Sequence, residues 1–269
     1  MDNLAVSMQG ITKIFNGVKA NDNVDFNLRK GSIHGLLGEN GAGKTTFVKL
    51  LKGLLRPTGG EIRFNGQDIS KLTVAALAKD IGLIFQNPND QIFKNTVLDE
   101  VMFGPVQIGM SKKQAKEVAL KALDMVGLKG AEKINPYDLG LSDRKMVSIA
   151  AIVAMDTKVV IFDEPTIAQD YTGKKRIQSI MKELQKEHKI VISILHDMDF
   201  VAETFDRAIV FAKGNALLDK DVKSVFREKE ILEQAYLEQP YTMQLCYELG
   251  YRDAFLSPEE FVAYKKANA

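Results

Sequence analysis

The sequence predicts an α/β fold built on a parallel sheet, and three features of the chain lead to this prediction. Short apolar runs of strand length recur at residues 33–37, 159–162 and 190–195. Helical periodicity lies between the runs, as expected when helices connect parallel strands. A glycine-rich turn follows the first run and leads into a predicted helix. Two segments depart from this order: we expect an antiparallel β subdomain at residues 4–37 and an inserted helical subdomain at about 95–155.

The N-terminal segment shows the alternation of an antiparallel strand with one solvated face. Val24, Phe26 and Leu28 alternate with polar residues, and Asn16-Gly17 predicts a turn before them. Phe15 stands just ahead of that turn and is our candidate to stack on an adenine ring. Simple core packing of this aromatic side chain is an equally open alternative.

The glycine-rich turn matches the phosphate-binding pattern G-x-x-x-x-G-K-[ST] without a mismatch. Its glycines allow successive N–H groups to point inward at an anion, and the following helix, expected over residues 46–55, presents its N-terminus to the loop. Lys44 adds a positive charge for the terminal phosphates, and the Thr45 hydroxyl can ligate Mg²⁺. The candidate nucleotide contacts in this loop are Gly38, Asn40, Gly41, Gly43, Lys44, Thr45 and Thr46.

The central part of the chain continues with a strand at residues 61–64, a tight turn at Asn65-Gly66 and a second strand at 81–85. Beyond residue 95 the period becomes helical. Ser111 is the predicted N-cap of a helix that Gly127 ends.

Acidic and polar side chains follow the predicted parallel strands at their carboxyl ends, where ligands bind in open α/β sheets. Asp163 and Glu164 end one apolar run: the first carboxylate can hold Mg²⁺, and the second can orient or deprotonate an attacking water. Gln86 can reach the metal or the water, and His196 can donate a hydrogen bond to the γ-phosphate. Together with the loop at Lys44, these residues predict a phosphate-binding loop fold that binds a nucleoside triphosphate and Mg²⁺.

Composition limits the partners and the cell compartment that we expect for this protein. The formal net charge of +1 gives no electrostatic reason to expect nucleic acid as a partner. The single cysteine, Cys246, suits a reducing cytoplasm and is expected to be a buried apolar filler. No uncharged run is long enough to span a bilayer, and the N-terminal residues 1–4 lack the features of a secretory signal. We therefore expect a protein inside the cell that reaches a membrane only through partners.

The order of these motifs, taken with Asp170, resembles that of the ATPase subunit of an ATP-binding-cassette (ABC) transporter over residues 4–225. The resemblance implies that Gln86 is the Q-loop glutamine, Glu164 the catalytic base, Asp170 the D-loop aspartate and His196 the switch histidine. It also implies a P-loop NTPase (RecA-like) core that binds ATP and Mg²⁺, in an ATPase domain over residues 1–225. A C-terminal helical extension over 226–269 follows this domain. Two such subunits would enclose two ATP molecules head to tail and drive integral-membrane subunits from the cytoplasmic face of the cell membrane.

Two stretches of the sequence indicate to which group of this family the chain is most similar. Residues 84–93 and the tail at 224–237 are similar to the energy-coupling-factor ATPases of vitamin and metal-ion uptake. Residues 17–20 and the loop at 38–44 also look like sugar or nucleoside importer ATPases, so that alternative stays open. A soluble ABC protein is a weaker alternative, because neither a second cassette with a basic linker nor a long coiled coil is evident. A kinase or GTPase is disfavoured by the Asp163-Glu164 pair with His196.

The signature loop of the family, L-S-G-G-Q, is altered in this chain. An ungapped alignment places residues 139–143, with the sequence L-G-L-S-D, at this loop, which we call the signature segment. Gly140 lacks the hydroxyl, and Leu141 adds a side chain where the backbone must approach a phosphate. Asp143 brings negative charge, although it is also placed to cap a helix. Ser142 remains a candidate nucleotide contact, and a gapped alignment would make Leu141-Ser142 the L-S pair. We therefore expect a second, different ATPase subunit with an intact signature, although a homodimer stays open.

Overall fold

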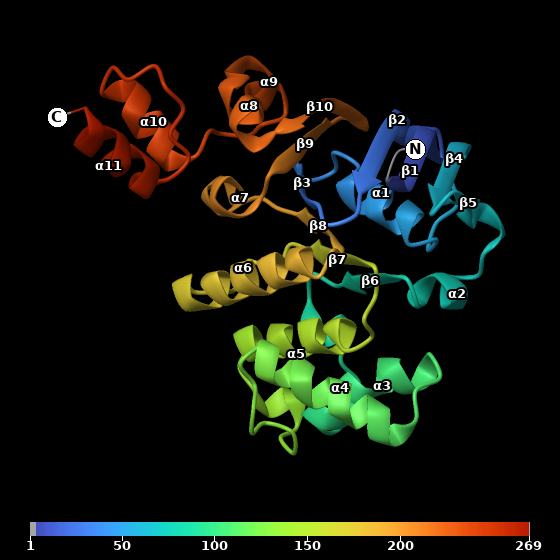
Figure 1. Cartoon of the computed structure of the whole chain (residues 1–269). Helices are drawn as coiled ribbons and strands as arrows, with labels where there is room; N and C mark the ends of the chain where they lie inside the picture. Colours follow the sequence, from blue (N-terminus) through green and yellow to red (C-terminus); the bar gives the residue numbers. More distant parts are fainter. Residues whose placement is uncertain (1–3, 269) are drawn as a thin grey trace.

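The computed structural model describes residues 4–268, so residues 1–3, which bear on the expected absence of a secretory signal, lie outside the described residues. Within the described range the chain forms two sheets with helices around them (Figure 1). The predicted α/β class, with an antiparallel β layer and inserted helices, is confirmed.

The first sheet is antiparallel and comes from the N-terminal quarter of the chain. Strands β1 and β2 pair along most of their length, and β4 lies on the other side of β1. Buried residues alternate along β2, which explains the alternation seen in the sequence. The order of the strands in this sheet is β2 (Val18–Arg29), β1 (Leu4–Phe15), β4 (Gly59–Phe64) and β5 (Gln67–Asp68).

The second sheet is mainly parallel and carries the candidate site. Strands β9, β3, β8, β7 and β6 run parallel, and only β10 pairs antiparallel, at one edge. Every residue of β3 and β8 is buried, as expected for strands covered on both faces. The order is β10 (Asn215–Asp221), β9 (Arg207–Ala212), β3 (Ile33–Leu37), β8 (Ile190–Ile194), β7 (Val159–Asp163) and β6 (Ile81–Ile84).

The helices fall into three groups in Figure 1. The helices next to the sheets are α1 (Lys44–Leu51), α2 (Val74–Ala78), α6 (Tyr171–Lys186) and α7 (Met198–Thr204). A separate green and yellow-green group at the bottom contains α3 (Val97–Gln107), α4 (Lys112–Met125) and α5 (Leu141–Val153). The tail at the upper left contains α8 (Val222–Arg227), α9 (Lys229–Gln234), α10 (Tyr241–Glu248) and α11 (Pro258–Ala267).

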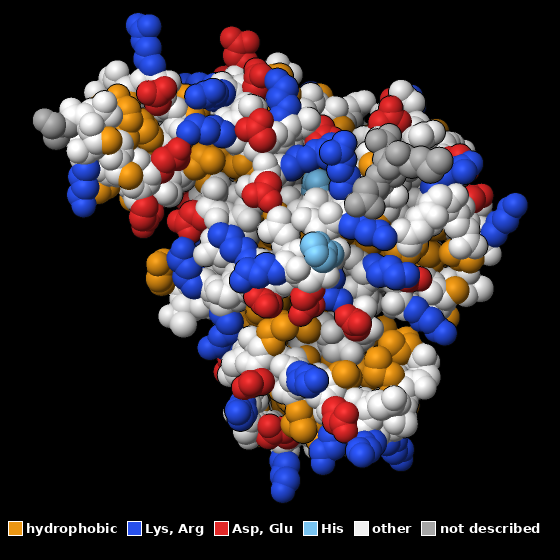
Figure 2. Space-filling view, viewed as in Figure 1, with side chains coloured by type: hydrophobic (Ala, Val, Ile, Leu, Met, Phe, Trp, Pro, Cys, Tyr) orange, Lys and Arg blue, Asp and Glu red, His pale blue; other side chains and the backbone are white. Residues whose placement is uncertain are grey.

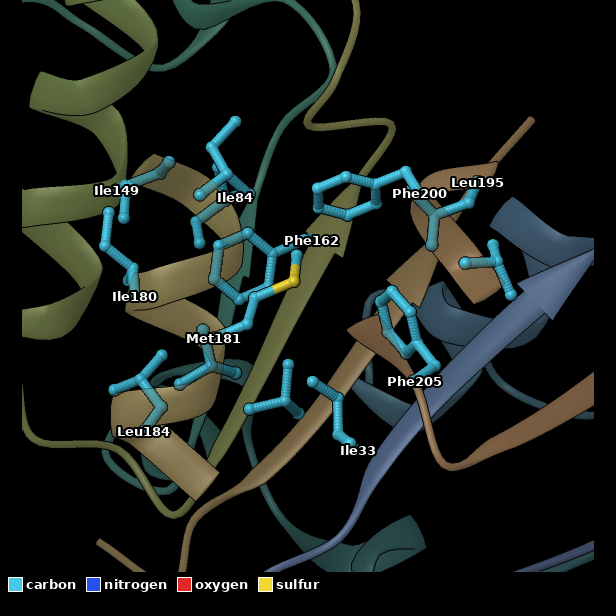
Figure 3. Packing of buried hydrophobic residues seen from close by; sticks show 14 of the residues in the cluster. Ile33, Ile84, Ile149, Phe162, Ile180, Met181, Leu184, Leu195, Phe200 and Phe205 are labelled. Carbon is cyan, nitrogen blue, oxygen red and sulfur yellow. The ribbon is translucent and has the colours of Figure 1, made fainter. Parts of the chain in front are cut away.

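One apolar core joins the parallel sheet to the helices on one of its faces. Figure 3 shows Phe162 of β7 beside Met181 of α6, with Ile84 of β6 and Ile149 of α5 close to them. Because α5 contributes to the same core as the sheet edge, the helical group is anchored to the strands that end at the site. Figure 2 shows acidic and basic side chains interspersed over one face of the molecule, in agreement with a net charge near zero.

The structure corrects several predicted boundaries. The helix after the phosphate loop covers Lys44–Leu51 and not 46–55, because the chain turns at Gly53, which has φ +76° and lies against Leu77. Helix α5 begins at Leu141, so three residues of the signature segment are already helical and not in a loop. Ser111 caps α4 as predicted, with a full capping box. Cys246 is buried on α10.

Candidate functional site

The phosphate loop connects β3 to α1, and its lysine is folded back into it. The Lys44 ammonium donates hydrogen bonds to the carbonyls of Gly38 (2.6 Å) and Glu39 (2.8 Å). Burial lowers the pKa of Lys44, while the carboxylates of Glu164, Asp163 and Glu39 act in the opposite direction. Asn40, Gly41 and Thr45 are exposed, and Thr46 is partly exposed. The loop therefore presents a buried cation behind a solvent-facing rim.

Two glycines of this loop have no room for a side chain. A Cβ on Gly43, at φ +102°, would lie 2.2 Å from the carbonyl oxygen of Ala20. A Cβ on Gly38, at φ +143°, would lie 2.3 Å from that of Phe211. The contact with β2 is extended by Asn21, whose side-chain amide donates to the Gly43 carbonyl at 3.3 Å. The loop is thus held by strands on both sides, which fixes the direction of its N–H groups.

The ends of β6, β7 and β8 bring three predicted catalytic residues into contact. Gln86 Nε2 donates to Glu164 Oε2 at 2.9 Å, and His196 Nε2 lies 3.1 Å from Glu164 Oε1. Glu164 has φ +46°, an uncommon value for a residue with a side chain, and its N–H donates to the Ile194 carbonyl at 3.1 Å. The two side-chain contacts occupy both carboxylate oxygens, so Glu164 is held from both sides.

Asp163 lies at the last position of β7, directly before Glu164. Burial and the neighbouring Glu164 carboxylate raise the pKa of Asp163, and the cations of Lys145, Lys49 and Lys44 oppose this shift. An added positive charge at this position would therefore be favourable, because it would offset two adjacent carboxylates.

The oxygen donors near the loop fit Mg²⁺. The Thr45 hydroxyl, the Asp163 carboxylate and the Gln86 amide oxygen are hard ligands of the kind this ion prefers. Among residues 4–268, no cluster of three or more His, Cys, Asp or Glu side chains could hold a metal by itself. One carboxylate with a hydroxyl and an amide oxygen is a donor set that suits Mg²⁺, which usually binds through one or two carboxylates together with substrate phosphates.

Three other predicted site residues lie outside this cluster of contacts. Phe15, at the end of β1, is 42% exposed and carries the Lys13 ammonium 4.9 Å from its ring centroid. Asp170 caps α6 by accepting a hydrogen bond from the Gly173 N–H at 2.7 Å. Ser142 donates to Gln169 Oε1 at 2.8 Å. The signature segment and the residue before Asp170 are therefore in direct contact.

Sequence reasoning missed two polar residues that support the site. Asn21 is fully buried beside Gly43, and Lys145 is a buried cation in contact with the main chain at Gln86. Asn21 could have been suspected, since it is a polar residue at an inward position of an alternating strand. Lys145 gives no such signal, because lysine is common on exposed helix faces.

The fold and the site define an ATPase of the cassette type, with a phosphate loop, an acidic pair at a strand end and an inserted helical group. Residues 21–167 match the family model described as "ABC transporter", and the chain belongs to this family of ATP-hydrolysing subunits.

Relatives and solved structures agree with this assignment. A putative ABC transporter ATP-binding protein of Caldanaerobacter subterraneus subsp. tengcongensis is 38% identical over 93% of this chain, which spans only 44% of that relative's length. The energy-coupling factor transporter ATP-binding protein EcfA of Methanocaldococcus jannaschii is 37% identical, with 86% of this chain and 83% of the relative covered. The structure of cbiO1 from Clostridium perfringens, described as part of the ABC transporter complex cbiONQ, superposes with a TM-score of 0.78 at 30% identity, covering 87% of this chain and 94% of cbiO1.

Proposed function

We propose that this chain is the ATP-hydrolysing subunit of an importer of the energy-coupling-factor type. The observation that carries the proposal is the contact of Glu164 with both Gln86 and His196. These residues follow strands of the same sheet as β3, the strand that leads into the Lys44 loop. The relatives named EcfA and the structural neighbour cbiO1 support the energy-coupling-factor type over the sugar or nucleoside type.

In this proposal ATP is bound by the glycines of the loop, Asn40, Lys44, Thr45 and Thr46, with Phe15 against the adenine. Lys44 neutralises charge on the terminal phosphates, and Glu164 orients the attacking water and accepts its proton. Gln86 and His196 hold the Glu164 carboxylate between them, so its orientation does not depend on the substrate. Mg²⁺, held by Thr45, Gln86 and Asp163, would supply charge neutralisation at the phosphates.

We propose further that the ATPase domain covers residues 1–225 with the helical group inserted at about 95–155, and that residues 226–269 form an extension. The extension is tied to the domain where the N–H of Tyr241 donates to Asp199 Oδ1 at 2.9 Å. Asp199 lies in the first turn of α7, three residues after His196. The extension is thus positioned to respond to changes at the switch histidine.

The partner we propose is a second ATPase subunit of different sequence, with an intact signature, together with integral-membrane subunits. Gly140 is the N-cap of α5 and makes no side-chain cap bond, Leu141 is 44% exposed, and the Ser142 hydroxyl is bonded to Gln169. Under the ungapped alignment Gly140 supplies no hydroxyl at the serine position of the signature, and the Ser142 hydroxyl is engaged by Gln169. The phosphate loop, in contrast, keeps every residue of its own pattern, and Glu164 is present after β7.

The structure describes no helix in residues 4–268 that is long and apolar enough to cross a bilayer. We propose that the chain is peripheral and reaches the cytoplasmic face of the membrane through its partners. Affinity purification from solubilised membranes, with identification of the co-purifying chains, tests this. Recovery of an integral-membrane subunit and a second ATPase chain supports the proposal, and recovery of the chain alone or with ribosomes contradicts it.

A turnover measurement tests the asymmetry. The purified chain is assayed for ATP hydrolysis alone and after mixing with the co-purifying ATPase subunit. We expect the mixture to be faster than the sum of the two separate chains. Equal turnover per site in the homodimer and the mixed dimer would contradict a weakened signature.

A further inference from the structure

A buried lysine of α5 lies next to the catalytic cluster. Lys145 is only 2% exposed, and its ammonium donates to the carbonyls of Phe85 (2.9 Å) and Gln86 (2.5 Å). No carboxylate among the described residues is within ion-pair distance of it. Its charge is compensated by these two carbonyls and, at longer range, by Asp163 and Glu164. Burying the charge of a lysine costs free energy, so a lysine at this position must gain a specific contact in return.

The two carbonyls belong to the first residues after β6, at the edge where β7 ends in Asp163. Gln86 is therefore gripped twice: its carbonyl accepts from Lys145, and its side-chain amide donates to Glu164. The hydrogen bond from Lys145 to the Gln86 carbonyl fixes the position of the Gln86 backbone, and therefore the point from which its side chain extends. A shift of the Gln86 backbone would lengthen its 2.9 Å contact with Glu164, and a hydrogen bond weakens quickly with distance.

Two further contacts attach the same loop to α5. Arg144 Nη1 donates to Asn89 Oδ1 at 2.8 Å, and Gln91 Nε2 donates to the Ser148 carbonyl at 3.3 Å. One turn beyond Lys145, Ile149 packs close to Ile84 of β6, as Figure 3 shows. These contacts attach the loop over residues 85–91 to the first half of α5, so we expect the two segments to move together. Lys145 is the one of these contacts that reaches Gln86.

Helix α5 begins inside the signature segment, at Leu141, one turn before Lys145. We propose that Lys145 is a positioning residue that sets Gln86 against Glu164 and passes displacements of the signature segment to that carboxylate. The proposal rests on the proposed catalytic role of Glu164. In a dimer it would couple one subunit's contact with its partner's nucleotide to hydrolysis of its own.

Lys52 provides a matched control. It is also buried, at 9% exposed, and its ammonium donates to the carbonyl of Ile81, at the opposite end of the same strand. Burial lowers the pKa of both lysines to about 8. Lys52 therefore shares the burial and the type of contact, but it is attached to the end of β6 remote from Gln86.

The test compares Lys145→Met, Lys145→Arg and Lys52→Met in the full chain with its co-purified subunits. We expect Lys145→Met to lower kcat at least tenfold while KM for ATP stays within threefold, since the Lys44 loop is untouched. Lys145→Arg should recover at least one third of the wild-type kcat. Lys52→Met should lower the melting temperature but keep kcat within twofold. A kcat of Lys145→Met within twofold of wild type, or equal losses in both Met variants, would overturn the proposal.

A double-mutant comparison and an exchange measurement separate positioning from folding. If Lys145 acts through Gln86, adding Lys145→Met to Gln86→Ala should change kcat less than twofold; full additivity overturns the proposal. Amide hydrogen exchange at residues 85–91 should rise in Lys145→Met and not in Lys52→Met, and this readout does not depend on activity. Should Lys145→Met not fold, Lys145→Gln, whose amide NH₂ is an uncharged donor group, takes its place. A wild-type chain without turnover would count against the proposed function, whereas unchanged exchange at 85–91 would count against Lys145 alone.

Discussion

Gln86 Nε2 and Glu164 Oε2 are joined by a 2.9 Å hydrogen bond, although the two residues are 78 positions apart in the chain. They meet because β6 and β7 are parallel neighbours, so the residues that follow them emerge at the same edge. The other oxygen of Glu164 faces His196, from the end of β8. The carboxylate is thereby oriented by protein groups before any substrate arrives.

The first prediction concerns that carboxylate. Glu164→Gln keeps the shape of the side chain but removes the basic oxygen, so we expect ATP to remain bound while hydrolysis falls by on the order of 10²-fold or more. Retained nucleotide and phosphate release measure the two effects. Glu203→Gln, which alters a carboxylate paired with Lys175 on α6, is the control and should hydrolyse ATP normally. Near-normal turnover in Glu164→Gln would move the catalytic role to another residue.

The second prediction concerns Gly43. A Cβ there would lie 2.2 Å from the Ala20 carbonyl oxygen, so Gly43→Ala must displace either β2 or the loop. The positive φ alone costs an L-residue about 1–2 kcal/mol, so we expect ATP affinity to fall roughly tenfold or more. Equilibrium binding of a labelled nucleotide measures this. Gly130→Ala, at φ +93° with open space around the Cβ position, is the matched control and should bind normally. Equal affinities of the two variants would show that the contact with Ala20 is unimportant.

The third prediction concerns the signature segment. The triple change Gly140→Ser, Leu141→Gly and Ser142→Gly restores the first four residues of the family pattern, L-S-G-G, and leaves Asp143 in the fifth position. Since removing one donor to developing charge commonly costs about 10²–10³ in rate, restoring such donors should raise turnover of the isolated chain by roughly tenfold or more. Steady-state ATPase assays at several protein concentrations check this.

The same triple change combined with Lys44→Ala is its control and should be inactive. Unchanged turnover in the triple variant would indicate that the gapped alignment, with Leu141-Ser142 as the L-S pair, describes the chain better.

The fourth prediction concerns pH and stability. His34 is buried on β3, and burial, followed by the positive charge of Arg207, lowers its pKa to about 3. The unfolded chain binds a proton at this residue below about pH 6.5, whereas the folded chain does not until about pH 3. Between these values the unfolded state carries more protons, so the free energy of unfolding falls as pH falls. The loss is about 1.4 kcal/mol per pH unit below 6.5.

Urea unfolding at pH 7.5 and 5.5 measures this contribution in wild type and in His34→Leu. The pH-dependent loss should be smaller in the variant by about 1.4 kcal/mol. His188→Gln, at an exposed position, should keep the wild-type dependence. The assignment would be wrong if His34→Leu showed the same loss as wild type.

Much of the fold followed from the sequence because its signals are local. The apolar runs at β7 and β8 are continuous, which indicates burial on both faces, and the loop at Lys44 has a fixed spacing. The rule that strand ends share an edge was enough to predict that Gln86, Glu164 and His196 lie at the same edge of the sheet, but it did not predict their contacts with one another.

The features that sequence reasoning missed depend on tertiary contacts. Helix α1 ends early because the chain turns at Gly53, at φ +76°, where an added Cβ would lie 2.5 Å from Leu77, a residue 24 positions later. Helix α5 starts inside the signature segment without a capping side chain, because its N-cap is Gly140, so no Ser, Thr, Asp or Asn marks the boundary. Lys145 carries a charge that would ordinarily face solvent, and only the contact between α5 and residues 85–86 shows why it is buried.

The one thiol of the chain lies on α10, with no accessible surface in the folded state. A cysteine-specific dye can react there only when the tail opens, so labelling kinetics report directly on how often α10 separates from its neighbours. Tyr241, at the start of that helix, donates a hydrogen bond to Asp199, which lies near His196. Comparing the labelling rate with and without nucleotide would therefore reveal whether nucleotide binding changes how often α10 opens. The natural sequence thus already contains a probe for this motion, and no engineered label is required.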